Sequence, residues 1–146
     1  MKYAESHKNA TYLSPKTVTQ FIEYISNYMF EEIVNEVKEC DNFSILMDEC
    51  TDEANRSELS VFTWLVKNGK IKNHFMELIY LPRCSAESIF EAVTKFFDKH
   101  GIDISDIRFA AMDGCATMAG VHNGVQALLG RCIAHFIYIH CRNHQT

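Results

Sequence analysis

Two short apolar runs that each end in an aspartate constrain the fold of this chain more than any other feature. Phe43–Met47 is followed by Asp48, and Ile107–Met112 is followed by Asp113. A short, mostly apolar run is typical of a strand that is buried on both faces of a sheet. If the two strands are parallel neighbours, the aspartates that follow them meet at the same edge of the sheet. Two such carboxylates could hold a divalent metal ion.

The segments around these runs predict a single α/β domain. Apolar residues at spacings of three and four indicate helices, alternation with period two indicates strands, and Asn68-Gly69 is typical of a hairpin turn. In chain order we predict a helix over 15–39 that begins after Ser14, strands over 43–48, 58–66 and 71–81, a helix over 86–99, a strand over 107–112, a turn over 114–120, a helix over about 122–129 and a strand over 136–140.

This order of elements predicts the topology. A hairpin followed by right-handed strand–helix–strand crossovers gives a mixed five-stranded sheet flanked by helices, with an antiparallel hairpin and parallel strands. We expect the strand over 107–112 to pair in parallel with the strand over 43–48. The polar segment 49–56 is predicted to be an acidic loop. Residues 1–12 are expected to form a flexible N-terminus, and residues 13–146 to form the domain.

Composition excludes several classes of function. The net charge is −5 with a pI near 5.8, which argues against tight binding of duplex DNA by this chain alone, because phosphate neutralisation needs a basic surface. The sequence has no apolar stretch long enough to cross a bilayer and no signal peptide at its start, so we expect a soluble, intracellular protein with no membrane partner. A homo-oligomer is an open alternative.

Cysteine and aromatic residues have ordinary structural interpretations. The six cysteines form no C-x-x-C pair and are expected to be reduced, several of them in the core. Cys141 and His144 have a zinc-like spacing, but zinc normally needs a second pair of ligands, so we favour a structural role for them. We also interpret Phe62 and Trp64 as core residues. Asp48 and Asp113, taken alone, fit a metal site or two aspartates that cap turns.

Several motifs occur in the order found in one family. Phe43–Asp52 resembles the "FSI..DE(S/T)TD" block of the hobo/Activator/Tam3 (hAT) transposase superfamily, and the hairpin that begins at Leu59 resembles the next block. Met112–Ala127 resembles the "DGA.NM.G...GV.A" block, and His140–His144 resembles the "HC..H" signature. The resemblance spans most of the chain and extends to transposase-derived domains of animal zinc-finger proteins. It implies a ribonuclease H-like fold and a nuclear location.

The resemblance also implies roles for individual residues. Asp48 and Asp113 match the first two members of a D-D-E triad that holds Mg²⁺ ions for phosphoryl transfer. Asp52 matches a further acidic position, for which we expect a structural role or a place behind the metal ligands. Of the cofactors, Mg²⁺ is therefore the one to test.

The sequence departs from the family pattern in one decisive respect. The third acid of the triad, a distant Glu, has no match in these residues, nor does the inserted helical region before it. We therefore interpret the chain as the N-terminal part of the catalytic domain, expect it to be catalytically inactive, and expect it to act through unidentified nuclear proteins or DNA-associated complexes. Two alternatives stay open: a metal-dependent transposase or nuclease half-site that takes its third acid from outside the chain, and a transposon relic without function.

Overall fold

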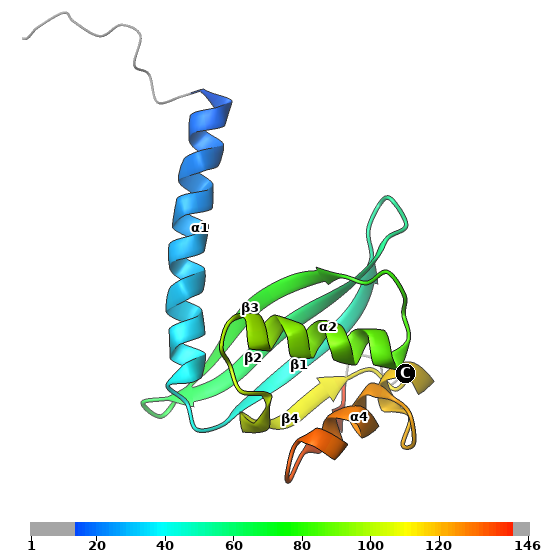
Figure 1. The fold of residues 1–146 in the computed structure, drawn as a ribbon. Helices are drawn as coiled ribbons and strands as arrows, with labels where there is room; N and C mark the ends of the chain where they lie inside the picture. The colour runs from blue at the N-terminus through cyan, green and yellow to red at the C-terminus, as the bar shows by residue number, and fades with distance from the viewer. Residues whose placement is uncertain (1–13, 142–146) are drawn as a thin grey trace, which may run out of the picture. The chain divides into compact units, whose positions relative to one another are not determined.

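The computed structural model describes residues 14–141 (Figure 1). Its contacts divide the chain into two compact units, residues 1–33 and residues 34–146, with the boundary inside helix α1 (Pro15–Lys38). We describe each unit by itself. The predicted flexible N-terminus, residues 1–12, lies outside the described residues, as does His144.

The described part of the first unit is the N-terminal part of α1. The predicted start is confirmed, because the backbone N–H of Thr17 donates to the Ser14 hydroxyl at 3.1 Å and satisfies one of the open donors of the first turn. The apolar side chains of this part do not form a core. Large apolar residues from Val18 to Met29 are exposed, whereas the buried residues of α1, Val34 and Val37, belong to the second unit.

The second unit contains a mixed five-stranded sheet in the order β3-β2-β1-β4-β5. The strands are β1 (Phe43–Thr51), β2 (Ser57–Lys67), β3 (Lys70–Tyr80), β4 (Ile107–Met112) and β5 (Ile137–His140). β1 pairs antiparallel with β2, and β2 with β3, while β4 pairs in parallel with both β1 and β5. The predicted α/β class and the parallel pairing of β1 with β4 are confirmed.

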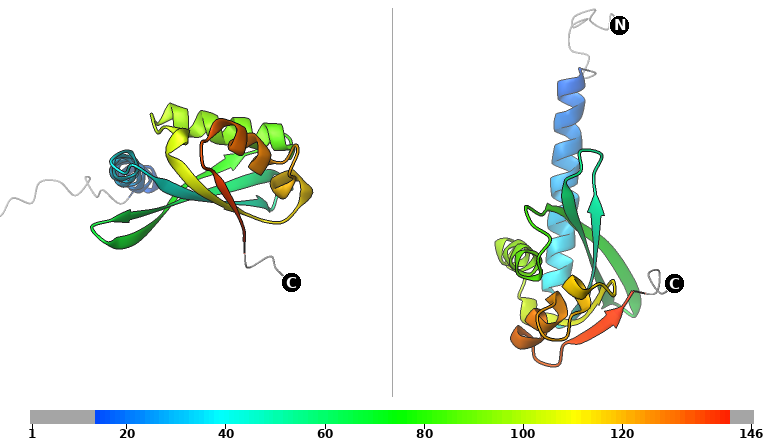
Figure 2. Two further views of the ribbon diagram at one scale, coloured as in Figure 1. Left: turned by 90° about the horizontal axis from the view of Figure 1, so that it is seen from below. Right: turned by 90° about the vertical axis from the view of Figure 1, so that its right-hand side faces the viewer.

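The helices α2 (Ala86–Lys99) and α4 (Val125–Cys132) pack against each other on one face of the sheet (Figure 2). Ser85 caps α2 as expected, since its hydroxyl accepts the Ser88 N–H at 3.2 Å. Apolar side chains from β1, β2, β4 and both helices fill the space between the layers. The largest fully buried side chains in this core are Ile45, Met47, Leu59, Ile89, Phe97, Ile107, Met112, Met118 and Leu129.

The structure differs from the sequence prediction mainly at the end of β1 and around β4, apart from shifts of one to three residues at other element ends. β1 continues to Thr51, so the loop begins at Asp52 and not at residue 49, because β2 supplies antiparallel partners for these polar residues up to Ser57. The turn after β4 contains a short helix, α3 (Ala116–Ala119), and α4 begins at Val125 and not near 122. A 3-10 turn (Ile104–Asp106), which we did not predict, leads into β4.

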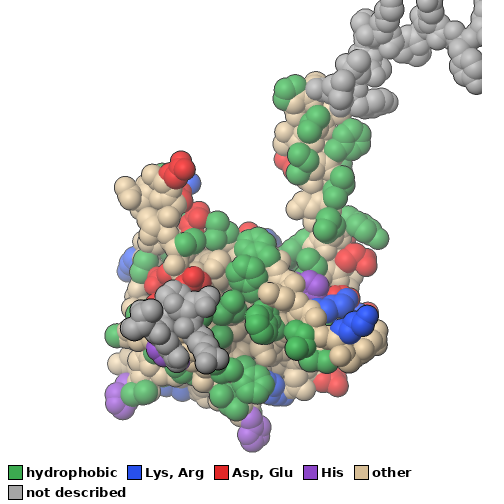
Figure 3. Space-filling model, turned by 180° about the vertical axis from the view of Figure 1, so that it is seen from behind, with side chains coloured by type: hydrophobic (Ala, Val, Ile, Leu, Met, Phe, Trp, Pro, Cys, Tyr) green, Lys and Arg blue, Asp and Glu red, His purple; other side chains and the backbone are tan. Residues whose placement is uncertain are grey.

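The opposite face of the sheet, which we call the open face, carries apolar side chains that remain exposed (Figure 3). The expected alternation of β2 is confirmed, with Leu59, Val61, Thr63 and Leu65 all buried toward the helices. The prediction that Trp64 is a core residue is wrong, because it lies on the open face and is 47% exposed. The other exposed apolar residues of this face are Val66, Ile71, Phe75, Leu78, Tyr80, Phe109, Ile137 and Ile139.

Candidate functional site: a carboxylate pair at the edge of an open sheet face

The register between β1 and β4 brings Asp48 and Asp113 to the same edge of the sheet. Pairing runs from Ser44 with Phe109 to Leu46 with Ala111, and the same offset relates Asp48 to Asp113 two residues further on. Because side chains alternate along a strand, residues two positions beyond Leu46 and Ala111 are expected on the same face as these, which is the open face. Asp48, in β1, and Asp113, directly after β4, therefore occupy corresponding positions two residues beyond the paired Leu46 and Ala111, and both residues are half-buried.

Asp113 is also part of the turn that leads into α3. Its Oδ1 accepts the backbone N–H of Cys115 at 3.3 Å, and its backbone carbonyl accepts the Tyr138 hydroxyl at 2.9 Å. The first of these contacts is what a turn-capping aspartate makes. One oxygen of Asp113 therefore acts as a turn cap, which is one of the two alternatives that the sequence left open. A role as a metal ligand stays a prediction.

Asp48 lies within β1 and pairs with Ser60 of β2, whereas the pairing of β1 with β4 ends at Leu46. The Asp48 backbone carbonyl accepts the Ser60 hydroxyl at 3.1 Å from the strand opposite. Partial burial first, and then the negative charges of Glu58, Asp48 and Asp52, raise the pKa of the Cys50 thiol. Three carboxylates, Glu58, Asp48 and Asp52, thus lie near this thiol, and Asp52 among them is paired with Arg56.

Asp52 organises the loop between β1 and β2. Its Oδ1 accepts the backbone N–H groups of Ala54 at 2.9 Å and Arg56 at 2.8 Å, and its Oδ2 pairs with the Arg56 guanidinium at 2.6 Å. The N–H and guanidinium of Arg56 lower the pKa of this carboxyl group. Both oxygens are thus engaged inside the loop, so the geometry favours the structural one of the two roles predicted for Asp52.

The C-terminal end of β5 lies beside the turn that carries Asp113. The Cys141 N–H donates to the Met112 carbonyl at 2.7 Å. A Cβ at Gly114 would lie 2.6 Å from His140 Nε2, so glycine allows the imidazole to approach the backbone after Asp113. His140 Nε2 is buried without a hydrogen-bond partner among the described residues. Cys141 is half-buried, and its predicted partner His144 lies outside the described residues.

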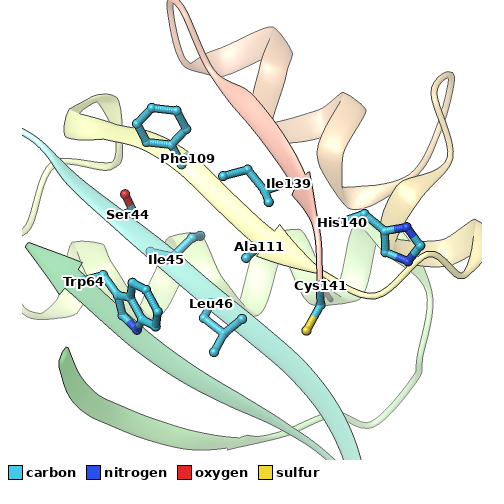
Figure 4. Close-up of a pocket in the computed structure, with 9 residues that line it drawn as sticks. All are labelled: Ser44, Ile45, Leu46, Trp64, Phe109, Ala111, Ile139, His140 and Cys141. Carbon is cyan, nitrogen blue, oxygen red and sulfur yellow. The ribbon is translucent and has the colours of Figure 1, made fainter. Parts of the chain in front are cut away.

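A pocket of about 490 Å³ lies on the open face next to the carboxylate pair. Its lining comes from β1, β2, β4 and the end of β5 and includes Leu46, Trp64 and Ile139. Figure 4 shows these side chains, and it shows the His140 ring pointing away from the others. The pocket is almost wholly apolar. Sequence reasoning missed this site, because apolar residues such as Trp64 gave no signal that they would remain exposed.

The prediction that several cysteines lie in the core is wrong. All six lie within residues 14–141, none is in a disulfide, and none is buried. Partial desolvation, followed by the side-chain hydrogen bond with Asp113, raises the pKa of Cys115, so this thiol is a poor nucleophile at neutral pH. Among the described residues, no cluster of three or more His, Cys, Asp or Glu side chains could hold a metal ion. Nor do residues 14–141 include a helix long and apolar enough to span a bilayer.

The fold and site define an α/β domain with a helix-covered mixed sheet and two carboxylates at the end of adjacent parallel strands. Residues 2–124 match the sequence model of the DUF4371 family, described as the ZMYM1/FAM200, RNase-like domain, and the chain belongs to this family. The match includes Asp48 and Asp113 and ends just before α4. The predicted RNase-like fold is thereby confirmed, and a transposase-derived origin is compatible with this family.

One solved structure has a low similarity to this chain. YeaZ from Pseudomonas aeruginosa has 16% sequence identity over 68% of this chain and 43% of that chain, with a TM-score of 0.36. This chain thus spans less than half the length of that protein. The similarity is too low to indicate an activity.

Proposed function

We propose that this chain is a transposase-derived domain of the hAT type that no longer performs strand transfer and that acts in the nucleus as a protein-binding module. The observation that carries the proposal is the open face, where all five strands of the sheet contribute to a continuous surface with exposed large apolar side chains from four of them. An exposed apolar surface of this extent is typical of a protein interaction site. The open face lies next to Asp48 and Asp113, the two residues for which the family resemblance predicts an ancestral role as metal ligands.

The chemistry of the surface specifies the partner. The apolar pocket would take large aliphatic or aromatic side chains, and the carboxylate pair at one edge would take a positive charge. An amphipathic helix with a basic residue at the end that faces Asp48 and Asp113 meets both requirements. Among residues 14–141 no third His, Cys, Asp or Glu side chain joins Asp48 and Asp113 in a group that could hold a metal ion, which supports loss of catalysis.

Trp64 allows a direct test, because it is the single tryptophan of the chain and lies in the pocket. A nuclear protein captured by the wild-type domain would be identified, purified and titrated against the domain while the Trp64 emission is recorded. We expect a blue shift that saturates, and we expect Ile139→Lys to abolish it. Val121→Lys is the matched control, since Val121 is 74% exposed but lies outside the open face. A partner that binds both variants equally would contradict the proposal.

A second candidate is a metal-dependent nuclease or transposase half-site that takes its third acid from another chain or segment. It is favoured by one observation, the placement of Asp48 and Asp113 two residues beyond Leu46 and Ala111, which pair between the parallel strands β1 and β4. In that case Mg²⁺ would be held by these carboxylates, and it would activate water or a 3′ hydroxyl for attack at phosphorus.

The two candidates differ in a DNA assay. Supercoiled plasmid would be incubated with the domain and Mg²⁺ or Mn²⁺, alone and with the binding partner added. Nicking by the wild-type chain that disappears in both Asp48→Asn and Asp113→Asn would establish the enzyme. We expect no nicking above that of the variants, and no perturbation of the Asp48 and Asp113 amides when Mg²⁺ is titrated in an NMR experiment. A chain with neither a partner nor activity would be a relic.

A further inference from the structure

The apolar pocket on the open face continues into a second hollow along the same strands. Ser44, Trp64 and Phe109 line both hollows, and the second one has a volume of about 390 Å³. In the first hollow, Trp64 and Ile139 stand on opposite sides of the small side chain of Ala111 (Figure 4). The two hollows therefore form one concave strip along β1 and β4, which we call the open-face groove.

The two ends of the open-face groove differ in charge. At one end, Asp48 and Asp113 follow the lining residues Leu46 and Ala111 by two positions, which places them on the same face. At the other end, Arg108 is half-buried and lines the second hollow. A segment that lies in this groove therefore meets negative charge at one end and positive charge at the other.

Arg108 has donors left for a partner. Its Nη1 donates to the Ser105 carbonyl at 2.7 Å, and a guanidinium carries five N–H donors. Within residues 14–141 no carboxylate forms a salt bridge with Arg108. Lys67, near the same end, pairs with Glu39 at 2.8 Å and with Glu36 at 3.5 Å. An acidic residue of a partner can therefore bind Arg108 without displacing an existing ion pair.

A helix fits the open-face groove better than an extended segment or a second copy of this face does. The backbone of the sheet is paired within the sheet, so an extended segment lying on the face would leave its own N–H and C=O groups without partners over apolar side chains. A helix satisfies these groups internally. A second copy of the face is hollow at the same place, so two copies facing each other would enclose a void.

The distance between the two charged ends specifies the spacing of charges on that helix. Asp113 follows Arg108 by five residues, which is at most about 16 Å along the strand at roughly 3.3 Å per residue. An α-helix covers this distance in about 11 residues, and residues 11 apart differ by only about 20° around its axis. We propose, as an extension that rests on the proposed protein-binding function, that Arg108 is the second charged anchor of this surface. It binds an acidic residue of the partner helix about 11 positions from the basic residue that meets Asp48 and Asp113.

Two synthetic peptides of equal composition test this spacing. The first has a lysine, leucines three, four and seven residues after it, and a glutamate eleven residues after it, on a background of alanine and glutamine. The second has the glutamate nine residues after the lysine, which places it on the opposite side of the helix. Neither peptide contains tryptophan, so a blue shift of the Trp64 emission reports binding to the full chain at low salt. We expect the first peptide to bind about three- to tenfold more tightly than the second.

Variants of the chain assign this difference to Arg108. Arg108→Ala should weaken binding of the first peptide about three- to tenfold and change binding of the second less than twofold, which also shows that the variant is folded. Lys95→Ala is the matched control, because Lys95 carries the same charge, has a 74% exposed side chain and lies on α2, which covers the other face of the sheet. It should change both dissociation constants less than about twofold.

The outcomes separate the role of Arg108 from the proposed function. Equal binding of the two peptides, or a preference that survives Arg108→Ala, would overturn the role of Arg108 and leave the binding surface in place. Absence of binding by either peptide up to about 1 mM would contradict a helix as the occupant, and it would therefore count against the proposed function too. A blue shift that grows with the concentration of the chain alone would show that a second copy occupies the groove, and would also overturn the proposal.

Discussion

The junction between Gly120 and Gly124 gives the sharpest test of how this sequence builds the segment that follows Asp113. The two backbones approach so closely that a Cβ at Gly124 would lie 2.4 Å from Gly120 N and 2.6 Å from Gly120 O. The Gly124 N–H also donates to the Gly120 carbonyl at 2.9 Å. Gly124 has a φ of −75°, which any residue can adopt, so the requirement for glycine here is one of space and not of backbone conformation.

The cost of Gly124→Ala follows from these distances. The Gly120 and Gly124 backbones would have to separate by about 1 Å to reach normal contact, which is an overpacking cost of about 1–3 kcal/mol. Losing the hydrogen bond between them adds about 1 kcal/mol. We therefore expect a decrease of about 2–4 kcal/mol in the free energy of unfolding. With a urea dependence of about 2 kcal/mol/M, the midpoint should fall by roughly 1–2 M.

Gly130→Ala is the matched control for Gly124→Ala. Gly130 lies within α4, and the nearest atom to an added Cβ is Phe136 Cδ1 at 3.6 Å, an ordinary contact. Because alanine favours the helix over glycine, this substitution should raise the free energy of unfolding by about 0.5–1 kcal/mol. Urea unfolding followed by circular dichroism measures both variants. Equal midpoints for Gly124→Ala and the wild type would refute the close approach of the two backbones.

Three further predictions concern ionisable groups. The hydrogen bond from Lys72, together with Lys67 and His74, lowers the pKa of Glu36 below its ordinary value of 4.5. The ionised Glu36 therefore stabilises the fold above pH 4.5, and this stabilisation is lost as the pH falls through the lower folded-state pKa. Glu36→Gln should decrease the free energy of unfolding at pH 7 by about 1–2 kcal/mol, measured by urea unfolding, and should make that free energy depend less on pH in the acid range. Asp52→Asn should speed proteolytic cleavage in the loop after β1, with cleavage products identified by mass spectrometry, and an unchanged pattern would contradict the loop contacts described above. Cys115 should react with iodoacetamide more slowly than an unstructured cysteine peptide at pH 7.5, because its raised pKa keeps the thiol protonated. An equal rate would contradict the raised pKa of this thiol.

Much of the sheet was predictable because its signals are local. The apolar runs before Asp48 and Asp113 identified the two central strands, and Asn68-Gly69 identified the hairpin, where both residues adopt positive φ angles of 53° and 70°. The end of β1 was not predictable, because Cys50 and Thr51 are polar enough for a loop. Their strand conformation depends on hydrogen bonds from β2, a partner that local sequence does not reveal.

Part of the candidate site could also be predicted from local sequence signals, and part of it could not. The common edge of the two aspartates followed from strand direction and could be predicted, whereas the turn contacts of Asp113 with Cys115 and Tyr138 required the structure. Hydrophobicity showed that Trp64 tends to be buried but not which surface would bury it. The sequence pattern of an apolar residue on a strand is the same whether a helix of the same domain or a separate partner covers that residue.

This ambiguity connects the two functional candidates. Leu46 and Ala111 line the apolar pocket, and the aspartates follow each of them by two residues on neighbouring strands. A segment that covers the pocket would therefore also place its own side chains beside the carboxylates. A basic side chain there would neutralise the pair and exclude a cation, whereas an acidic one would complete a three-carboxylate metal site. The charge of the covering segment opposite Asp48 and Asp113 thus decides whether this face serves as a binding surface or as a metal centre.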